Sequence, residues 1–362
     1  MDELRIGGAP VVSLRDETPP ADGPAIVAAT VLPGRGMMLL QARLRLPSGA
    51  EVDALFAPSA ADAATDMDGG AEDFAGNRSF AYGGAILAPF ANRIRGRALE
   101  GSGEIEAVVD GRTVRLPRNW GGKALGAEQY AMHGLILDAA VRFEQPSPGV
   151  VRGRLAAGDF AGRWPSRTDL AFEWRLAGGA LELSIEARNL GDEALPMGIG
   201  WHPYLALPSG DRRQARLRLP AGRRTEVNDY DEVLPTGQLL DVAGTLYDFN
   251  SPDGAPLGDL YLDDCFTDLR RERGAAIVEV TDPAAGVGLR VTSTSPHVHA
   301  LQVYAPPDKA FVVVEPQFNL ADPYSALWPP GTQTGMATVP AGDAVTYDAR
   351  LEPFALRNRP PA

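Results

Sequence analysis

The sequence predicts an all-β protein, organised as an antiparallel β-sandwich. Short segments in which apolar and polar residues alternate recur along the chain, and alternation with a period of two is typical of half-buried strands. The 362 residues include 40 glycines and 31 prolines, enough to supply the many turns that such a fold needs. We find no long amphipathic helical pattern and no internal repeat. We therefore predict one domain over residues 1–362.

The first strands are predicted at 25–31, 37–46 and 51–56, with turn-forming residues between them. In 37–46, apolar side chains at every second position alternate with Gln and Arg, and 181–187 shows one of the clearest alternations in the chain. Further strands are predicted at 105–109, 113–116, 150–156, 169–176, 214–219, 275–280, 287–292, 299–304, 311–315 and 344–351.

Two segments lack such a pattern. Residues 57–82 are rich in Ala, Gly and Asp, and we predict a long surface loop there, with a lid as one interpretation. The tail at 357–362 is predicted to be loose, because chain ends without apolar anchors are rarely held in place.

Charge and composition restrict the partners. A net charge of −13 argues against nucleic acid or an anionic membrane surface, since both call for a basic face. Cys265 is the only cysteine, so neither an intrachain disulfide nor a cysteine metal cluster is expected. The first eight residues lack a hydrophobic signal core, and no apolar run approaches the roughly 20 residues of a membrane helix. We expect a cytoplasmic protein, monomeric or homodimeric.

Glu315 is the candidate around which the other motifs are arranged. It ends an apolar strand in which Phe311, Val313 and Glu315 share one face. Apolar neighbours remove water from a carboxylate, which raises its pKa toward the range useful for a general base. Because Pro316 has no N–H, we expect regular pairing to end there. A strand-end glutamate that caps a turn or pairs with an arginine is the alternative.

Two further motifs could form a binding pocket. Small residues at 83–91 precede Asn92 and Arg93, an amide and a guanidinium suited to hydroxyl recognition, although an arginine held in a salt bridge is the alternative. In the second motif Pro203 restricts His202 to extended geometry, and the rings of Trp201 and Tyr204 could wall a pocket.

The chain has four histidines. His297 and His299 lie two apart on a predicted strand and share a face, which would suit a pair of metal ligands. No third His or Cys lies nearby in the sequence, so we interpret them as packing or hydrogen-bonded residues and expect no metal site.

Six motifs, in this order, together resemble the aldose 1-epimerase (mutarotase) family. They are Ala91-Asn92-Arg93-Ile94, Met132-His133-Gly134, Gly200-Trp201-His202-Pro203-Tyr204, Leu262-Asp263-Asp264-Cys265-Phe266, Leu301-Gln302-Val303-Tyr304 and Val314-Glu315-Pro316-Gln317. The resemblance implies a galactose mutarotase-like supersandwich, that is, a large twisted antiparallel β-sandwich whose concave face holds one monosaccharide. It implies Glu315 as general base, His202 as general acid and His133 as a second histidine near the ring oxygen. The hydroxyl-binding residues that it implies are Asn92, Arg93, Asp263 and Gln302, where a shift of one residue would exchange Asp263 for Asp264.

Anomer interconversion opens the sugar ring, rotates about C1–C2 and closes it again. A proton must leave the C1 hydroxyl and another must reach the ring oxygen, which calls for a base and an acid. Carboxylate and imidazole suit these roles if burial raises the pKa of the carboxyl and a nearby charge keeps the imidazole protonated. No metal or other cofactor is required.

Two alternatives stay open. One is a sugar-binding or regulatory protein without turnover, which would not need an acid and a base together. The other is an epimerase of phosphorylated hexoses, which would need a cationic site built from some of Arg95, Arg97, Arg163 and Arg167. The family often shows another glycine where Leu135 stands and a Pro-Asp segment near 318–323, and these departures bear on substrate identity.

Overall fold

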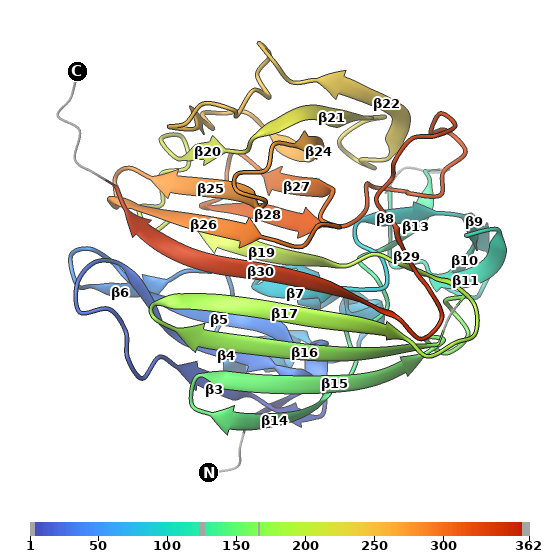
Figure 1. The fold of residues 1–362 in the computed structure, drawn as a ribbon, viewed down its shortest axis with the longest axis horizontal. Coiled ribbons are helices and arrows are strands. Elements are labelled where there is room, and N and C mark those ends of the chain that lie inside the picture. Colours follow the sequence, from blue (N-terminus) through green and yellow to red (C-terminus); the bar gives the residue numbers. More distant parts are fainter. Residues whose placement is uncertain (1–3, 123–126, 166, 357–362) are drawn as a thin grey trace.

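The computed structural model describes residues 4–122, 127–165 and 167–356. It contains two large antiparallel sheets, as the alternation in the sequence predicts (Figure 1). The predicted loose tail at 357–362 lies outside the described residues. In the described part of the chain, no helix is both long and apolar enough to cross a membrane.

The first large sheet has nine strands. In spatial order they are β14 (Arg142–Ser147), β15 (Val150–Gly158), β16 (Thr168–Ala177), β17 (Ala180–Asn189), β30 (Ala344–Ala355), β26 (Val287–Ser293), β25 (Ala276–Asp282), β20 (Arg216–Arg218) and β23 (Ala255–Pro256). The predicted alternation at 181–187 is confirmed, because Leu181, Leu183 and Ile185 of β17 are buried in the core.

The second large sheet has eleven strands. In spatial order they are β22 (Pro235–Asp241), β21 (Ala221–Val227), β24 (Leu262–Leu269), β27 (Ala300–Ala305), β28 (Phe311–Gln317), β19 (Gly200–Ala206), β7 (Gly84–Leu87), β5 (Met38–Arg45), β4 (Ala25–Leu32) and β3 (Val12–Arg15), with β6 (Glu51–Asp53) paired to β5. Strand β28 lies near its centre, between β27 and β19.

Four small sheets complete the fold. They are formed by β1 (Arg5–Ile6) with β2 (Ala9–Pro10), by β9 (Arg97–Leu99), β10 (Glu104–Val109) and β11 (Arg112–Pro117), by β8 (Arg93–Arg95), β12 (Trp120–Gly121) and β13 (Gln129–Met132), and by β18 (Leu195–Met197) with β29 (Ala337–Val339).

Aromatic side chains join the two large sheets across the core. Trp174 of β16 and Trp201 of β19 meet edge to face, with ring centroids 5.6 Å apart. The Trp174 indole donates a hydrogen bond of 2.8 Å to the Met37 carbonyl, so the polar atom of this buried ring is satisfied. The nine-stranded sheet thus covers one face of the eleven-stranded sheet, and the opposite face of the eleven-stranded sheet is available for a binding site.

Regular pairing continues past Pro316, so the prediction that it ends there was wrong. Leu301 and Ala300 of β27 pair with Pro316 and Gln317. A proline is tolerated in a central strand only where its missing donor costs no ladder bond. On the side of β19, Gln317 pairs with Gly200 and the next pair is Val313 with Tyr204, so Pro316 itself is not paired with β19. The Pro316 carbonyl accepts a hydrogen bond from the Tyr347 hydroxyl.

Residues 57–82 are partly helical, which corrects the prediction of a loop. Helix α1 (Ala60–Asp66) is capped by Ser59, whose hydroxyl oxygen accepts the backbone N–H of Asp62. The 3₁₀ element η2 (Ala71–Phe80) follows, with non-helical backbone at 73–76, and a separate 3₁₀ turn, η1 (Pro33–Arg35), lies earlier in the chain. The segment is also anchored, because buried Asp73 forms a two-pronged ion pair with Arg35. The interpretation of this segment as a lid stays a prediction. The helix was missed because seven residues give too short a pattern to recognise.

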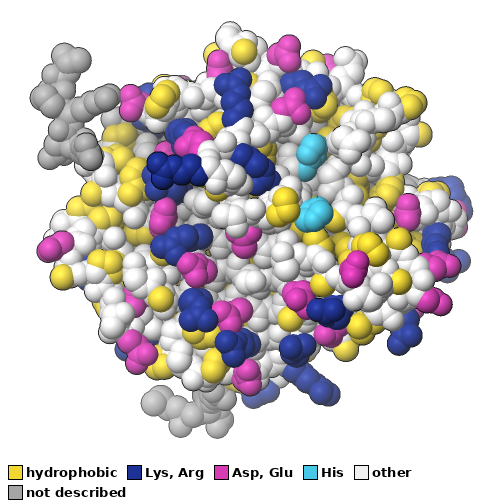
Figure 2. All heavy atoms as spheres, viewed as in Figure 1, with side chains coloured by type: hydrophobic (Ala, Val, Ile, Leu, Met, Phe, Trp, Pro, Cys, Tyr) yellow, Lys and Arg dark blue, Asp and Glu magenta, His cyan; other side chains and the backbone are white. Residues whose placement is uncertain are grey.

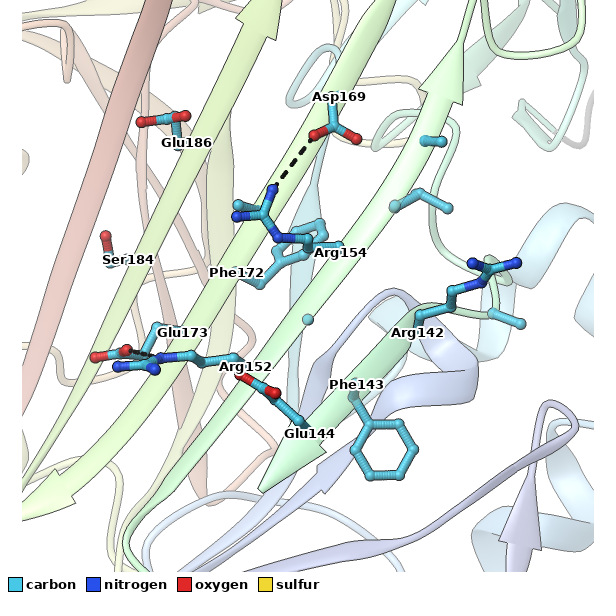
Figure 3. A pocket seen from close by; sticks show the side chains of 15 residues that line it. Arg142, Phe143, Glu144, Arg152, Arg154, Asp169, Phe172, Glu173, Ser184 and Glu186 are labelled. Carbon is cyan, nitrogen blue, oxygen red and sulfur yellow. Dashed lines mark hydrogen bonds and ion pairs between the residues drawn. The ribbon is translucent and has the colours of Figure 1, made fainter. Parts of the chain in front are cut away.

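The exposed face of the nine-stranded sheet carries charges of both signs, interspersed rather than gathered into a basic patch (Figure 2). Neighbouring strands place arginines opposite carboxylates, as between Arg152 and Glu173 at 2.7 Å and between Arg154 and Asp169 at 3.7 Å. These pairs line a broad hollow on that face (Figure 3). Because its charges neutralise one another and it holds no histidine, this hollow lacks the acid–base groups that the sequence singled out.

Candidate active site

A cavity of about 630 Å³ opens on the face of the eleven-stranded sheet that points away from the nine-stranded sheet. Alternation along β28 sets this arrangement: Val312 and Val314 pack in the sandwich core, while Phe311 and Val313 lie on the opposite face with Tyr204. Glu315 shares that second face and lines the cavity. The sequence prediction for this strand face is confirmed.

Burial acts on Glu315 as expected. The side chain is almost wholly buried, and loss of solvation raises the pKa of its carboxyl well above the usual value. The negative charge of Asp263 raises it further, whereas the Arg93 guanidinium opposes the shift. In the free protein, burial therefore favours the protonated, uncharged form of the Glu315 carboxyl.

His202 lies directly against this carboxyl, with Nε2 3.2 Å from Glu315 Oε1. Burial lowers the pKa of His202 to about 4, and the Arg93 charge acts in the same direction. The condition set out in the sequence analysis, that a nearby charge keeps this imidazole protonated, is not met in the free protein, because burial and the positive charge of Arg93 both lower the pKa of His202. The pair thus holds one proton between two groups, and burial favours its uncharged form.

His133 completes the group. Its ring centroid lies 4.9 Å from that of His202, and burial lowers its pKa as well, with smaller effects of His202 and Arg93. The residue follows β13 in a left-handed backbone conformation, and its N–H donates to the Asn92 carbonyl at 2.9 Å. That bond joins two motifs that are some 40 residues apart in the sequence.

The four predicted hydroxyl-binding residues form a closed ring of hydrogen bonds. Asn92 Nδ2 donates to Gln302 Oε1 at 2.9 Å, and Gln302 Nε2 donates to Asp263 Oδ1 at 2.5 Å. Arg93 closes the ring, donating to Asp263 Oδ2 at 3.4 Å and to Asn92 Oδ1 at 2.9 Å. Arg93, Asp263 and Gln302 line the cavity. Asn92 lies behind these residues and has no exposed surface, so it supports Gln302 and Arg93 through hydrogen bonds and does not itself line the cavity.

Asp263 and Asp264 take opposite sides of β24. Asp263 lines the cavity, and Asp264 is buried, bonded to Arg224 at 2.8 Å and to the Tyr230 hydroxyl at 3.1 Å. Desolvation raises the pKa of Asp264 to about 6 despite the Arg224 charge. The register chosen in the sequence analysis therefore matches the structure, yet Asp264 supports Tyr230, which itself lines the cavity.

Aromatic rings form much of the cavity wall. Of the two predicted rings, Tyr204 lines the cavity and donates to the Phe80 carbonyl at 2.8 Å, whereas Trp201 faces the sandwich core. Sequence reasoning missed the further aromatic residues of the wall, which are Phe80, Trp120, Tyr230, Tyr261 and Tyr304. Tyr304 could have been found, because it lies two residues after Gln302 on one strand and so shares its face.

The other histidines and the candidate phosphate-binding arginines lie elsewhere. His299 contacts Thr267 and His297 packs against the Phe318 ring, and neither lines the cavity. None of Arg95, Arg97, Arg163 and Arg167 lines it either. Arg95 is paired with Asp322 at 2.9 Å and Arg97 with Glu106 at 2.7 Å. A phosphate site built from these four arginines gains no support.

Comparison with known proteins gives the family. The family model described as aldose 1-epimerase matches residues 46–340, which is most of the chain. The chain belongs to the aldose 1-epimerase family. A search of curated proteins found no match.

Solved structures of this family share the fold. An aldose epimerase homologue from C. elegans has a TM-score of 0.70 at 16% identity, over 96% of this chain and 99% of that one. A galactose mutarotase-like protein from Clostridium acetobutylicum has a TM-score of 0.68 at 17% identity, covering 91% and 93%. A putative aldose 1-epimerase from Escherichia coli K12 has a TM-score of 0.67 at 18% identity, covering 96% and 99%. At such identities the likeness establishes the galactose mutarotase-like fold.

Proposed function

We propose that this protein is an aldose 1-epimerase that interconverts the α and β anomers of a free monosaccharide, a hexose such as galactose or glucose. The observation that carries the proposal is the 3.2 Å contact between His202 Nε2 and Glu315 Oε1 at the bottom of the cavity. A protein that only binds sugar does not need a buried acid and base in contact, because burying them without a task costs stability.

In the proposed reaction Glu315 is the base and His202 is the acid. Transfer of the shared proton across the 3.2 Å contact gives a carboxylate and an imidazolium. Glu315 then takes the proton of the C1 hydroxyl while His202 donates its proton to the ring oxygen, and the C1–ring oxygen bond breaks. Rotation about C1–C2 and the reverse proton transfers close the ring as the other anomer. Paired groups of this kind contribute about 10²–10⁴-fold each.

The remaining polar groups orient the sugar. Arg93 and Asp263 offer charge-assisted hydrogen bonds to ring hydroxyls, Gln302 adds neutral ones, and His133 lies beside His202 near the ring oxygen. Each residue of the hydrogen-bonded ring is already aimed by its neighbours, so little ordering remains to be done when sugar binds. Asn92 acts as a positioning residue behind them.

The carboxylates of the cavity favour an uncharged substrate. Glu72, Asp231 and Asp263 line the cavity together with Glu315, against two arginines, Arg78 and Arg93. Arg93 is tied to Asp263, and Arg78 is 3.6 Å from Glu72. A phosphorylated sugar would bring two negative charges to this surface, which is unfavourable.

Proton exchange spectroscopy at equilibrium tests the proposal directly. Each aldose of a panel is observed with and without protein, and magnetisation transfer between its α and β anomeric protons gives the interconversion rate. We expect acceleration for at least one free hexose and a smaller effect for its 6-phosphate. Sugar binding without acceleration for any aldose would contradict the proposal and favour the regulatory alternative.

The sequence expectations of one domain over residues 1–362, a cytoplasmic location and a monomeric or homodimeric state stay proposals that go with this function.

A further inference from the structure

Three side chains at the bottom of the cavity have the composition of a metal site. One ligand atom from each of His133, His202 and Glu315 lies within 4.8 Å of the other two, and all three residues are buried. Two imidazoles and one carboxylate form the ligand set that proteins use for Zn²⁺ and for several other divalent transition metals. The 3.2 Å separation of His202 Nε2 and Glu315 Oε1 already suits two ligands on one ion.

A second observation points to a ligand at the same place. Glu315 Oε2 is buried and has no hydrogen-bond partner among the residues that the structure describes, and the same holds for Nδ1 of both histidines. Buried polar atoms in folded proteins nearly always have a hydrogen-bond partner. The unpaired oxygen of Glu315, beside two imidazoles, therefore has lone pairs that a metal ion could use. The cavity gives a small ion access to them.

We propose that His133, His202 and Glu315 reversibly bind a divalent transition metal ion such as Zn²⁺, and that the bound ion excludes the sugar reaction. The ion would occupy the lone pairs of the imidazole and of the carboxylate that proton transfer requires. Its open coordination positions would face the cavity, where the sugar ring has to lie.

The surroundings favour a weak, reversible site over a permanently held ion. Metal-binding histidines usually donate their second ring N–H to a carboxylate or carbonyl, which strengthens the site. Within the described parts of the chain, neither His133 Nδ1 nor His202 Nδ1 has such a partner. The metal is therefore inferred to be an inhibitor and not a cofactor of the proposed reaction.

The test uses Co²⁺, whose visible absorption reports coordination by nitrogen and oxygen. Full-length protein without a histidine tag is treated with a chelator, freed of it, and titrated with Co²⁺ in the absence of sugar, with calorimetry in parallel. We expect one ion per chain. His133→Asn and Glu315→Gln should each weaken binding about 100-fold. The matched controls His297→Asn and His299→Asn, which change histidines outside the cavity, should bind as the wild type does.

Two results would overturn the inference: no Co²⁺ binding by the wild type at millimolar concentration, or equal loss in the control variants. Circular dichroism shows whether each variant is folded, and the near-isosteric Glu315→Gln keeps the test valid if His133→Asn does not fold. Because binding is measured without turnover, a negative result leaves the proposed function untouched. A sugar that the protein interconverts should weaken Co²⁺ binding in proportion to its concentration, and indifference to sugar would refute the competition.

Discussion

Glu315 combines two properties that rarely occur together, since it is buried and in contact with a second titratable group. We expect Glu315→Gln to lower turnover at least 100-fold, because an amide keeps the shape of the side chain but cannot accept a proton. Exchange spectroscopy measures the rate, and thermal unfolding shows whether the fold is retained. A variant with more than about a tenth of wild-type activity would remove Glu315 from the role of base.

The pH dependence follows from the shared proton of Glu315 and His202. The reactive pair holds one proton, and it gains a second one when pH falls through the pKa of His202, which burial lowers to about 4. We therefore expect kcat/KM to fall on the acid side near pH 4, well below the value of about 6.5 for a free imidazole. At higher pH the pair loses its one proton, so activity should fall again above the raised pKa of Glu315. An acid limb near 6.5 would show that His202 is solvated in the working protein.

Arg93 serves binding and not proton transfer. Arg93→Ala removes the hydrogen bonds that Arg93 donates to Asp263 Oδ2, to Asn92 Oδ1 and to a sugar hydroxyl, at about 1–3 kcal/mol for each acceptor left unpaired in a buried setting. We expect KM to rise about tenfold or more with a smaller change in kcat, as when a contact is equal in the ground and transition states. Arg95→Ala is the matched control, because Arg95 is the next arginine of β8 and does not line the cavity.

At the scale of elements, the connection between β21 and β22 forms one wall of the cavity and is tied to β24. Tyr230 lies on this connection, lines the cavity and donates to Asp264, which also holds Arg224. The tie places a half-exposed ring beside Tyr261, at 5.1 Å between centroids. A buried residue on the side of β24 away from the cavity thus acts on the cavity through the connection.

This tie changes what is expected of Asp264. By strand alternation alone, Asp264→Asn should be close to silent for sugar binding, because the residue lies on the side of β24 away from the cavity. The structure predicts instead a loss of stability of about 1–3 kcal/mol, because Arg224 loses its buried counter-charge, and a rise of KM of a few-fold. Urea unfolding and steady-state kinetics measure the two effects. Tyr230→Phe keeps the ring and should show the smaller change in both, and a silent Asp264→Asn would mean that the tie is not needed.

At the scale of the whole molecule, the cavity depends on the packing between the two large sheets. Trp174 lies at this interface, fully buried against Trp201 of the strand that carries His202. We expect Trp174→Ala to lower the free energy of unfolding by about 3–5 kcal/mol, the usual cost of truncating a buried tryptophan. Trp120→Ala, which removes a ring that is 44% exposed, should cost little stability. Equal losses in the two variants would contradict this packing argument.

The alternation of apolar and polar residues was enough to predict the fold class and most of the long strands. Alternating stretches such as 181–187 correspond to real strands because a strand with one buried face needs an apolar side chain at every second position. Alternation says only that Asp263 and Asp264 point to opposite faces of a strand; the family resemblance implied Asp263 as the binding residue, and Asp263 lines the cavity. Elements of two or three residues, such as β1 and β23, were missed because they are too short to carry a pattern.

The protonation of His202 and Glu315 and the hydrogen-bond partners of the cavity residues could be inferred only from the folded structure. The sequence motifs brought His202 and Glu315 into one proposal, but the charges of the two groups depend on their burial and on the positive charge of Arg93. Asn92 has the right chemistry for a sugar, yet the hydrogen-bonded ring places it behind Gln302 and Arg93. The solvation and the hydrogen-bond partners of these side chains depend on segments that are more than 200 residues apart in the chain, as Asn92 and Gln302 are. A local pattern in the sequence therefore cannot predict them.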